Sequence, residues 1–312
     1  MTARRAGPLR VGLVGCGRWG RHILRDLLAL DAQVTVADPD PGARADAQGF
    51  EVEAVSDLAA LPPALDGLVV ATPASTHAAV IEALLPRGIP IFVEKPLANQ
   101  PAAARRLAEA GQGRLFVMEK WRWHPGVIFL ASLARDRTLG PVEALTCLRL
   151  QTDCPIADVD PIWTLLPHDL SIATEILGRI PTAVAATAEY RDDRPTGLKG
   201  DLGTAAPLLH VEVSAAREAY HRLVLLTCRN GTAFWSSDAD DVVFLHRRRD
   251  ENRQLPLERH AVVGEPPLLA ELRTFLAHLA GGPPPKATAA DGAATVEAVA
   301  ALRHLAGLDA EA

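Results

Sequence analysis

The sequence predicts an α/β protein in which an N-terminal doubly wound parallel sheet precedes an α+β domain with an open, largely antiparallel sheet. Strand-like and helical stretches alternate through about residue 120, whereas strand-like runs separated by turn residues dominate from about residue 141. The 312 residues also exceed the size of one typical core. We therefore expect one domain at residues 1–120 and another at 121–312, with C-terminal helices at about 267–307 packing back on the first domain.

The first 38 residues follow a strand–turn–helix–strand pattern. An apolar run over Leu9–Val14 leads into Gly15-Cys16-Gly17-Arg18-Trp19-Gly20, a helical stripe follows, and a second apolar run ends at Asp38. Glycines at this spacing permit the bend, let a pyrophosphate approach the backbone, and allow close packing of helix on strand. The helix N-terminus attracts the phosphates. The pattern predicts a Rossmann dinucleotide site; the alternative is an ordinary βαβ unit whose glycines serve packing alone.

Asp38 indicates which dinucleotide binds. Its position, about 20 residues after the glycines, allows it to accept hydrogen bonds from an adenosine ribose. A carboxylate favours a free 2′-hydroxyl and repels a 2′-phosphate, and no arginine follows before Arg44. NAD is therefore expected in preference to NADP.

Polar residues follow the later strands of the predicted parallel sheet. Thr72-Pro73, Glu94-Lys95-Pro96 and Glu119-Lys120 come directly after apolar runs, and ligands of such sheets bind beyond the carboxyl ends of the strands. The cofactor-binding residues that we expect are Gly15, Gly17, Arg18, Trp19, Gly20, Asp38, Thr72, Pro73, His77, Glu94 and Lys95.

In the second half, strand-like runs at 142–151, 183–189, 209–214, 222–227 and 242–246 are interrupted by one helix at about 168–177. Asn230-Gly231 predicts a hairpin. The polar segment 191–207 predicts a long loop, either functional or mobile. Two amphipathic helices are expected at 267–279 and 295–305.

Two residues are candidates for the chemistry. Lys95, aimed by Pro96, can hydrogen-bond a substrate oxygen and stabilise alkoxide character during hydride transfer; ordinary loop material is the alternative. His168, expected at the start of a helix, has a side chain suited to proton exchange; the alternative is that it only helps to cap the helix after Pro167. Asp169 is expected to favour the helix N-terminal dipole.

The segment Trp121-Arg122-Trp123-His124-Pro125 leaves the last strand of the first domain, and we expect it to line the interdomain cleft. Indole faces stack on sugar rings, and Arg122 can hold a carboxylate or phosphate. The competing interpretation is that both tryptophans are interdomain packing.

Composition and residue spacing argue against several classes of partner and site. The formal charge of −6 and the absence of long apolar runs argue against nucleic-acid and membrane partners. The four cysteines lack paired spacing, and no histidines share ligand-like spacing, so neither disulfides nor a metal site is predicted. The expected location is the cytoplasm.

Taken together, these residues resemble the Gfo/Idh/MocA oxidoreductase family, the relatives of glucose–fructose oxidoreductase and inositol dehydrogenase. The resemblance rests on Gly15–Gly20, Asp38, Ala71–His77, Glu94-Lys95-Pro96, Pro167–Leu170 and Leu268–Leu272. It implies a Rossmann domain, a second domain whose open sheet forms the interface of a homodimer or homotetramer, and NAD-dependent oxidation or reduction of a sugar, cyclitol or nucleotide-sugar. Lys95 and His168 would be the catalytic lysine and histidine.

One departure from the family pattern concerns Thr164. The family usually has an aspartate here, four residues before the histidine, and a residue one turn back can reach it. Threonine hydrogen-bonds but carries no charge; Asp158 or Asp160 is a possible substitute. We therefore keep two hypotheses: a dehydrogenase in which Arg122, Trp123, Trp163 and Thr164 help to bind substrate, or a catalytically weak NAD-binding sensor or assembly protein.

Overall fold

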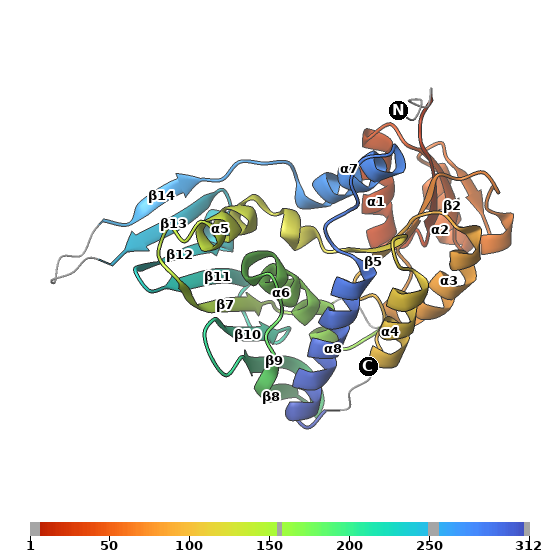
Figure 1. The fold of residues 1–312 in the computed structure, drawn as a ribbon. Helices are drawn as coiled ribbons and strands as arrows, with labels where there is room; N and C mark the ends of the chain where they lie inside the picture. The colour runs from red at the N-terminus through yellow and green to blue at the C-terminus, as the bar shows by residue number, and fades with distance from the viewer. Residues whose placement is uncertain (1–6, 155–157, 249–255, 309–312) are drawn as a thin grey trace. The chain divides into compact units, whose positions relative to one another are not determined.

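The computed structural model describes residues 7–154, 158–248 and 256–308 (Figure 1). Their contacts divide the chain into two compact units. The first holds the described residues through Lys120 together with Leu268–Ala293, and the second holds Trp121–Pro267 and the described chain from Ala294 onward. The helices expected at about 267–307 are thus divided between the two units.

The first unit is built on a six-stranded parallel sheet, as predicted. Its strand order is β3-β2-β1-β4-β5-β6. The strands are β1 (Arg10–Val14), β2 (Gln33–Ala37), β3 (Glu53–Val55), β4 (Gly67–Val70), β5 (Ile91–Glu94) and β6 (Leu115–Met118). Every residue of β4, β5 and β6 is buried, which is typical of parallel strands covered on both faces.

Five α-helices belong to this unit, wholly or for most of their length. They are α1 (Arg18–Ala29), α2 (Pro41–Gln48), α3 (His77–Leu84), α4 (Pro101–Ala110) and α7 (Pro267–Leu279). Short 3₁₀ turns at Ala74–Thr76 and Leu85–Arg87 flank α3, and Gly88 follows in the left-handed conformation. The helix expected over 75–87 is therefore an α-helix with a tighter turn at each end.

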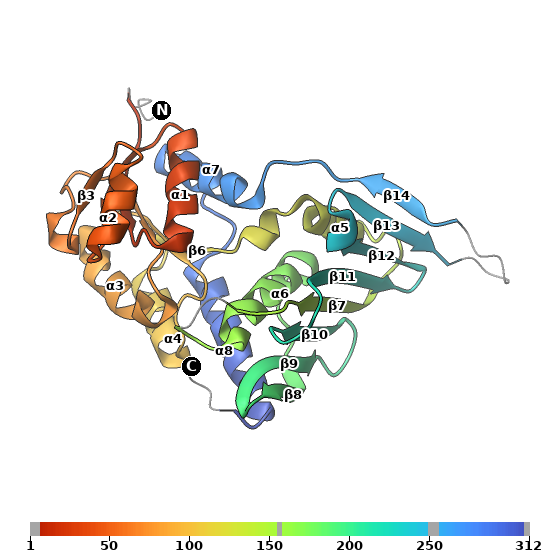
Figure 2. The same cartoon turned by 180° about the vertical axis from the view of Figure 1, so that it is seen from behind.

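α7 joins the first unit because its apolar face completes the core. Phe275 stacks on Phe92 of β5 with ring centroids 4.9 Å apart, and Leu272 is fully buried. Ile23 and Leu27 of α1 belong to the same core cluster, and α1 and α7 lie side by side in Figures 1 and 2. Burial of these side chains contributes about 1.5–3 kcal/mol each.

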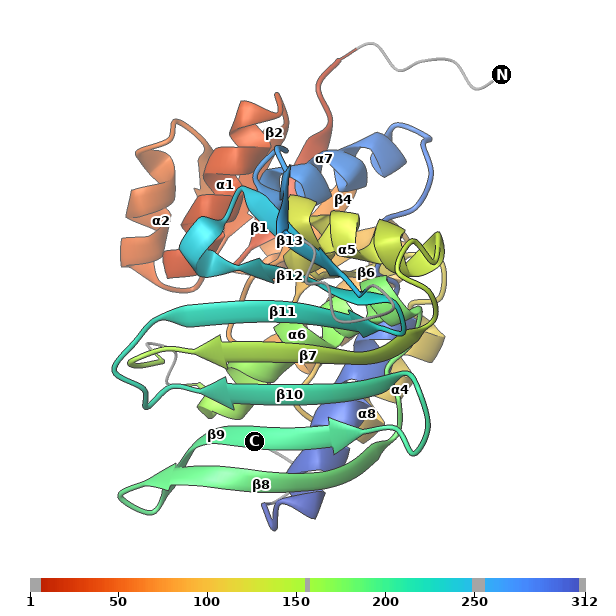
Figure 3. The ribbon, with the colours of Figure 1, turned by 90° about the vertical axis from the view of Figure 1, so that its left-hand side faces the viewer.

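The second unit contains an eight-stranded sheet, largely antiparallel as predicted (Figure 3). The order is β14-β13-β12-β11-β7-β10-β9-β8, with one parallel pair, β10 on β7. The strands are β7 (Val142–Leu150), β8 (Ala183–Arg191), β9 (Arg194–Leu202), β10 (Leu208–Ser214), β11 (His221–Cys228), β12 (Gly231–Ser236), β13 (Val242–Arg247) and β14 (Glu258–Ala261). The predicted hairpin at Asn230-Gly231 connects β11 to β12.

Helices cover one face of this sheet. α5 (Pro125–Arg135) and α6 (Pro161–Leu177) pack against each other and against the sheet. Most of α8 (Ala289–Leu305) also belongs to this unit, where Leu302 lies against the backbone of Gly200 in β9. Figure 3 views the opposite, open face, with α6 and α8 behind the strands.

The expectation that His168 begins a helix is wrong. α6 starts at Pro161, and its N-cap is Asp160, whose carboxylate accepts from the backbone N–H groups of Ile162 (2.9 Å) and Trp163 (3.2 Å). Asp160 and a proline at N1 form a strong start signal. Pro167 therefore lies inside the helix rather than in its first turn.

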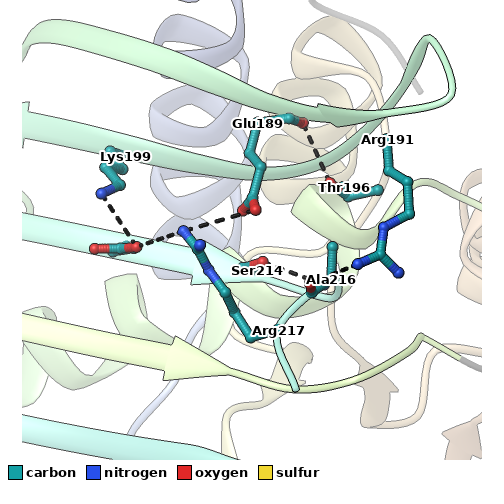
Figure 4. A network of polar contacts seen from close by, with 8 residues as sticks. Glu189, Arg191, Thr196, Lys199, Ser214, Ala216 and Arg217 are labelled. Carbon is teal, nitrogen blue, oxygen red and sulfur yellow. Dashed lines mark hydrogen bonds and ion pairs between the residues drawn. The ribbon is translucent and has the colours of Figure 1, made fainter. Parts of the chain in front are cut away.

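The long loop expected at 191–207 is also wrong. β8 and β9 form a tight hairpin in which Asp192 and Asp193 both have positive φ, 50° and 60°. Polar contacts hold this hairpin to β10 (Figure 4). Arg217 pairs with Glu189 of β8 (3.6 Å) and Glu212 of β10 (3.2 Å). Pairing of β9 with β8 and β10 thus satisfies the backbone hydrogen bonds of a segment whose polar sequence had suggested a loop.

Among the described residues, no helix combines the length and apolarity needed to cross a membrane.

Candidate functional site

The turn between β1 and α1 approaches the end of β4 very closely. Gly15 has a φ of +89°, and a Cβ there would lie 2.7 Å from the backbone carbonyl of Ala71. A Cβ on Gly20 would collide with the carbonyl oxygen of Gly15, whereas one on Gly17 would meet nothing within 4 Å. The first and third glycines are therefore required for packing, and Gly17 leaves open space over the turn.

A groove of about 740 Å³ lies beside this turn within the first unit. The expected cofactor residues that line it are Gly15, Gly17, Arg18, Trp19, Asp38, Thr72 and Pro73. Asp38, which directly follows β2, is 8% exposed and accepts hydrogen bonds from the backbone N–H groups of Cys16 (2.7 Å) and Asp40 (2.9 Å). These bonds orient the carboxylate at the wall of the groove and leave each oxygen with a lone pair for a ribose hydroxyl.

These residues fit a dinucleotide. The open space above Gly17 faces the N-terminus of α1, whose first turn contains no acidic side chain, so unpaired N–H groups and the helix dipole favour a diphosphate there. Arg44, the nearest following arginine, donates to the backbone oxygens of Asp38 and Pro39.

The other expected cofactor residues do not line the groove. Gly20 lies under the turn, and His77 is 1% exposed, with its ring nitrogens 2.7 Å from the carbonyl oxygen of Pro96 and 3.0 Å from that of Thr72. His77 thus links the loops after β4 and β5 rather than reaching a ligand in the groove.

Glu94 and Lys95 lie at the carboxyl end of β5. Glu94 accepts hydrogen bonds from the indole N–H of Trp19 (2.5 Å) and the backbone N–H of Lys95 (3.1 Å). The ammonium group of Lys120 lies 4.2 Å from the Trp19 ring centroid. Burial raises the pKa of Glu94, although the nearby Lys95 opposes that shift. The indole of Trp19 is thus positioned between the glycine turn and this polar group.

Glu271 of α7 is a buried acid that the sequence analysis did not identify. It is 1% exposed, and neither carboxyl oxygen has a hydrogen-bond partner in the described structure. Burial, followed by the charge of Glu94, raises its pKa well above the ordinary value. Burial thus favours the neutral form of Glu271, which limits the negative charge beside Glu94. Its only sequence signal is an acidic residue on the apolar stripe of a helix.

In the second unit, His168 projects from the middle of α6, one helical turn after Thr164. The Thr164 hydroxyl donates to the backbone oxygen of Asp160 (3.3 Å). The Asp160 carboxylate caps the helix and pairs with Arg303, so it is already engaged and does not supply the missing charge. Trp163 is fully buried and cannot stack on a sugar.

Two further expectations change. Asp169 is not near a helix N-terminus; it forms a buried bidentate ion pair with Arg149 of β7, at 2.8 and 3.1 Å. Arg122 pairs with Glu175 at 3.1 Å, and both side chains are largely buried. Its charge is therefore already balanced within the protein.

The indole that meets the histidine is Trp121 rather than Trp123. Its ring centroid lies 6.4 Å from that of His168, 4.7 Å from the guanidinium carbon of Arg149 and 5.0 Å from that of Arg222. The sequence analysis missed both arginines. The available signal was alternation, which puts Arg149 on the same face of its strand as Leu145 and Cys147.

Among the described residues, no group of three or more His, Cys, Asp or Glu side chains is arranged to hold a metal ion.

The part of the chain that contains the groove is similar in sequence to a known protein family. Residues 9–116 match the model of an oxidoreductase family with an NAD-binding Rossmann fold. Inositol 2-dehydrogenase of Rhizobium meliloti is 30% identical, over 64% of this chain and 64% of that enzyme, which is less than two thirds of its length. UDP-N-acetylglucosamine 3-dehydrogenase of Acidithiobacillus ferrooxidans is 29% identical over 76% of this chain and 75% of that enzyme.

Solved structures share the fold along almost the whole chain. The A. ferrooxidans enzyme superposes with a TM-score of 0.83 at 22% identity, covering 96% of this chain and 97% of the other. A levoglucosan dehydrogenase in complex with NADH gives a TM-score of 0.85 at 18% identity, with the same coverage.

We expect Asp38→Ala to weaken NAD binding about 10–100-fold, because it removes charge-assisted hydrogen bonds to a ribose, and to abolish discrimination against NADP. Titration calorimetry with both dinucleotides measures the effect, and thermal unfolding reports any loss of fold. Asp46→Ala in α2 is the matched control, since Asp46 pairs with Arg21 on the surface. Unchanged NAD affinity in Asp38→Ala would contradict the assignment.

Glu271 should make stability depend on pH. Its folded-state pKa is raised, so its contribution is complete below the ordinary pKa of the unfolded chain, near 4.5, and is lost as pH rises toward the folded value. Glu271→Gln should therefore reduce the decline in unfolding free energy between pH 5 and 8, by at most about 1.4 kcal/mol for each pH unit.

Denaturant unfolding at several pH values measures that slope. Glu109→Gln, an exposed carboxyl in α4, should leave it unchanged. An identical slope in Glu271→Gln and the unmodified protein would show that Glu271 is ionised in the folded state.

Proposed function

We propose that this chain is a member of the Gfo/Idh/MocA family of NAD-binding oxidoreductases, which its similarity to that family supports, and that it transfers a hydride between NAD and a hydroxyl or keto carbon. The observation that carries the proposal is the groove over Gly17, with the oriented Asp38 carboxylate at its wall. The substrate class that we propose is a sugar, cyclitol or nucleotide-sugar, because relatives are named as dehydrogenases of inositol and UDP-N-acetylglucosamine.

Bound NAD would supply the hydride acceptor, and its reduced form the donor. In our proposal Asp38 binds the adenosine ribose, the N–H groups at the start of α1 bind the diphosphate, and Arg18, Trp19, Thr72 and Pro73 line the path between them. The indole N–H of Trp19 also donates a hydrogen bond to Glu94, the residue directly before Lys95. Trp19, which lines the groove, is therefore close to Lys95 as well.

We propose that Lys95 binds the substrate oxygen at the reacting carbon and that His168 transfers the hydroxyl proton. The ammonium group of Lys95 stabilises negative charge that develops on the substrate oxygen when a hydride moves. The imidazole of His168 accepts the hydroxyl proton during oxidation and returns it during reduction.

A sensor or assembly role without turnover is the competing proposal, motivated by Thr164. Threonine cannot stabilise a protonated His168 by charge, so we expect a slower reaction than an aspartate would give. The retained Lys95 and His168 support an enzyme, and turnover assays decide between the two.

We also propose that the protein acts in the cytoplasm as a homodimer or homotetramer. All four cysteines are free, as is usual in a reducing compartment. The open face of the second sheet carries half-buried apolar side chains in a row across three strands: Leu225, Phe234 and Phe244. A partly exposed apolar sheet face of this kind supports self-association.

Turnover is tested with NAD and a panel of sugars, cyclitols and nucleotide-sugars, following absorbance of the reduced nicotinamide. Lys95→Ala should lower kcat about 10²–10⁴-fold, because charge stabilisation in the transition state is lost, while NAD affinity changes little. Lys95→Arg keeps the charge and should recover part of the rate. Normal turnover by Lys95→Ala would disprove the assignment.

His168→Ala should lower kcat about 10²–10⁴-fold and remove the acidic limb of the pH–rate profile for oxidation, because the general base is gone. His304→Ala, in the last turn of α8, is the control. If the profile of His168→Ala keeps that limb, another group exchanges the proton.

Leu225→Glu should shift the protein to monomers in light scattering, since it puts a charge in the centre of the apolar row. Val263→Glu makes the same change at a side chain that is 90% exposed and should leave the assembly intact. A monomeric unmodified protein would refute the oligomer proposal.

A further inference from the structure

Two arginines face each other across neighbouring strands of the second sheet. Arg222 of β11 is the direct register partner of Arg149 of β7. Both side chains project from the face that α6 covers, because each lies two positions along its strand from a buried residue, Val224 for Arg222 and Cys147 for Arg149. Like charges directly opposite each other destabilise a sheet, so this pair needs compensating negative charge.

Of the two arginines, only Arg149 has a direct ion pair among the described residues; the charges of Asp169 and Asp240 also act on Arg222 and partly oppose the effects of burial and of Arg149. Asp169 binds Arg149 through both carboxylate oxygens. Arg222 forms no ion pair with any described residue; Asp240, a nearby carboxylate, is largely exposed and lies 3.4 Å from the Nε2 atom of His124. Burial, followed by the charge of Arg149, lowers the pKa of Arg222. The cation is therefore held in an environment that disfavours it.

The guanidinium of Arg222 also has unused donors. Its Nε atom is buried and has no acceptor in the described structure, whereas its two terminal nitrogens are not buried and donate to no described residue. A buried donor without a partner is destabilising, because its lost hydration is not replaced. An anion bound at the terminal nitrogens of Arg222 would supply both the negative charge and the hydrogen-bond acceptors that this guanidinium lacks.

Aromatic rings fix the orientation of this guanidinium next to the proposed catalytic histidine. Its carbon lies 5.0 Å from the centroid of Trp121 and 4.5 Å from that of Tyr220. Rings on the faces of a guanidinium leave its edge available for bidentate hydrogen bonding. The Trp121 ring also packs in a T-shaped arrangement with His168, with centroids 6.4 Å apart, so Arg222 and the residue proposed to exchange the proton lie against the same indole.

We propose that Arg222 binds a carboxylate of the substrate, and hence that the substrate is a sugar acid rather than a neutral sugar. This inference rests on the function proposed above. One unbalanced cation matches the single charge of a carboxylate, whereas a phosphate dianion would remain half neutralised. Arg222 takes the role that the sequence had suggested for Arg122, whose charge Glu175 already balances.

The test uses matched substrate pairs that differ only in a carboxylate, D-glucuronate with D-glucose and D-galacturonate with D-galactose. Initial rates with NAD and binding to the NADH-bound protein by calorimetry are both measured. At least one acid should bind about 10–100-fold more tightly than its neutral partner. Arg222→Ala should remove this preference through Kd and KM, with kcat for the acid changing less than about threefold.

Two further variants separate recognition from folding. Arg222→Lys keeps the charge without the planar fork and should retain part of the preference. Arg229→Ala removes an arginine next to the opposite end of β11, where Arg229 lies 3.9 Å from Glu143, and should leave the preference intact. Thermal unfolding of each variant in the presence of NAD verifies that the protein is folded.

Three outcomes would overturn the inference: neutral sugars bound as tightly as their acids, an acid preference that survives Arg222→Ala, or an Arg222-dependent preference for D-glucose 6-phosphate or UDP-N-acetylglucosamine over the sugar acids. Turnover of neutral sugars alone would refute the inference and leave the oxidoreductase proposal standing. Tight, Arg222-dependent binding of a sugar acid without NAD reduction would refute the oxidoreductase proposal and leave Arg222 as a carboxylate site.

Discussion

The nucleotide-binding unit depends on how closely the β1–α1 turn approaches the end of β4. Side chains at Gly15 or Gly20 would collide with backbone atoms of Ala71 or of the turn itself, so only glycine allows strand, helix and neighbouring strand to meet there. That close packing directs the free N–H groups of α1 toward the groove. Asp38 then bonds the backbone of Cys16, which ties the end of β2 to the same turn.

Electrostatics at the carboxyl end of β5 connect this groove to the proposed chemistry. Glu94 bonds both Trp19 and the backbone of Lys95, so a side chain of the glycine turn and the proposed catalytic lysine share one acceptor. Glu271 adds a second buried carboxyl, whose pKa is raised by burial and by the charge of Glu94. Burial thus disfavours additional negative charge around the ammonium group that we propose to stabilise the substrate oxygen.

The second unit must accommodate two like charges, because Arg149, which is buried, and Arg222, which is partly exposed, lie opposite each other on one face of its sheet. Asp169 neutralises Arg149 from α6, one residue after His168. This ion pair fixes the rotation of the helix about its axis and therefore the direction in which the histidine projects. The aromatic ring of Trp121 separates the charged groups from the core around Trp235. In our proposal the two arginines therefore have different roles: Arg149 is buried and held by Asp169, whereas Arg222 is partly exposed and has no direct ion pair among the described residues.

Local patterns in the sequence determined the parallel sheet, the glycine turn, Asp38 and the position of Lys95 at a strand end, because each depends on spacing along a short stretch of chain. The tertiary structure decided what depends on distant partners. α6 begins at Pro161, after the N-cap Asp160, whose carboxylate also binds Arg303, 143 residues away. The polar 191–207 segment is a hairpin because β10 offers it a partner strand. Arg222 meets Arg149 only through the register of β11 on β7. Strand register and ion pairs between remote segments leave no periodic signal in the sequence, so the surroundings of Arg222 and Trp121 in the second unit, and those of Glu271 in the first, could be known only from the folded chain.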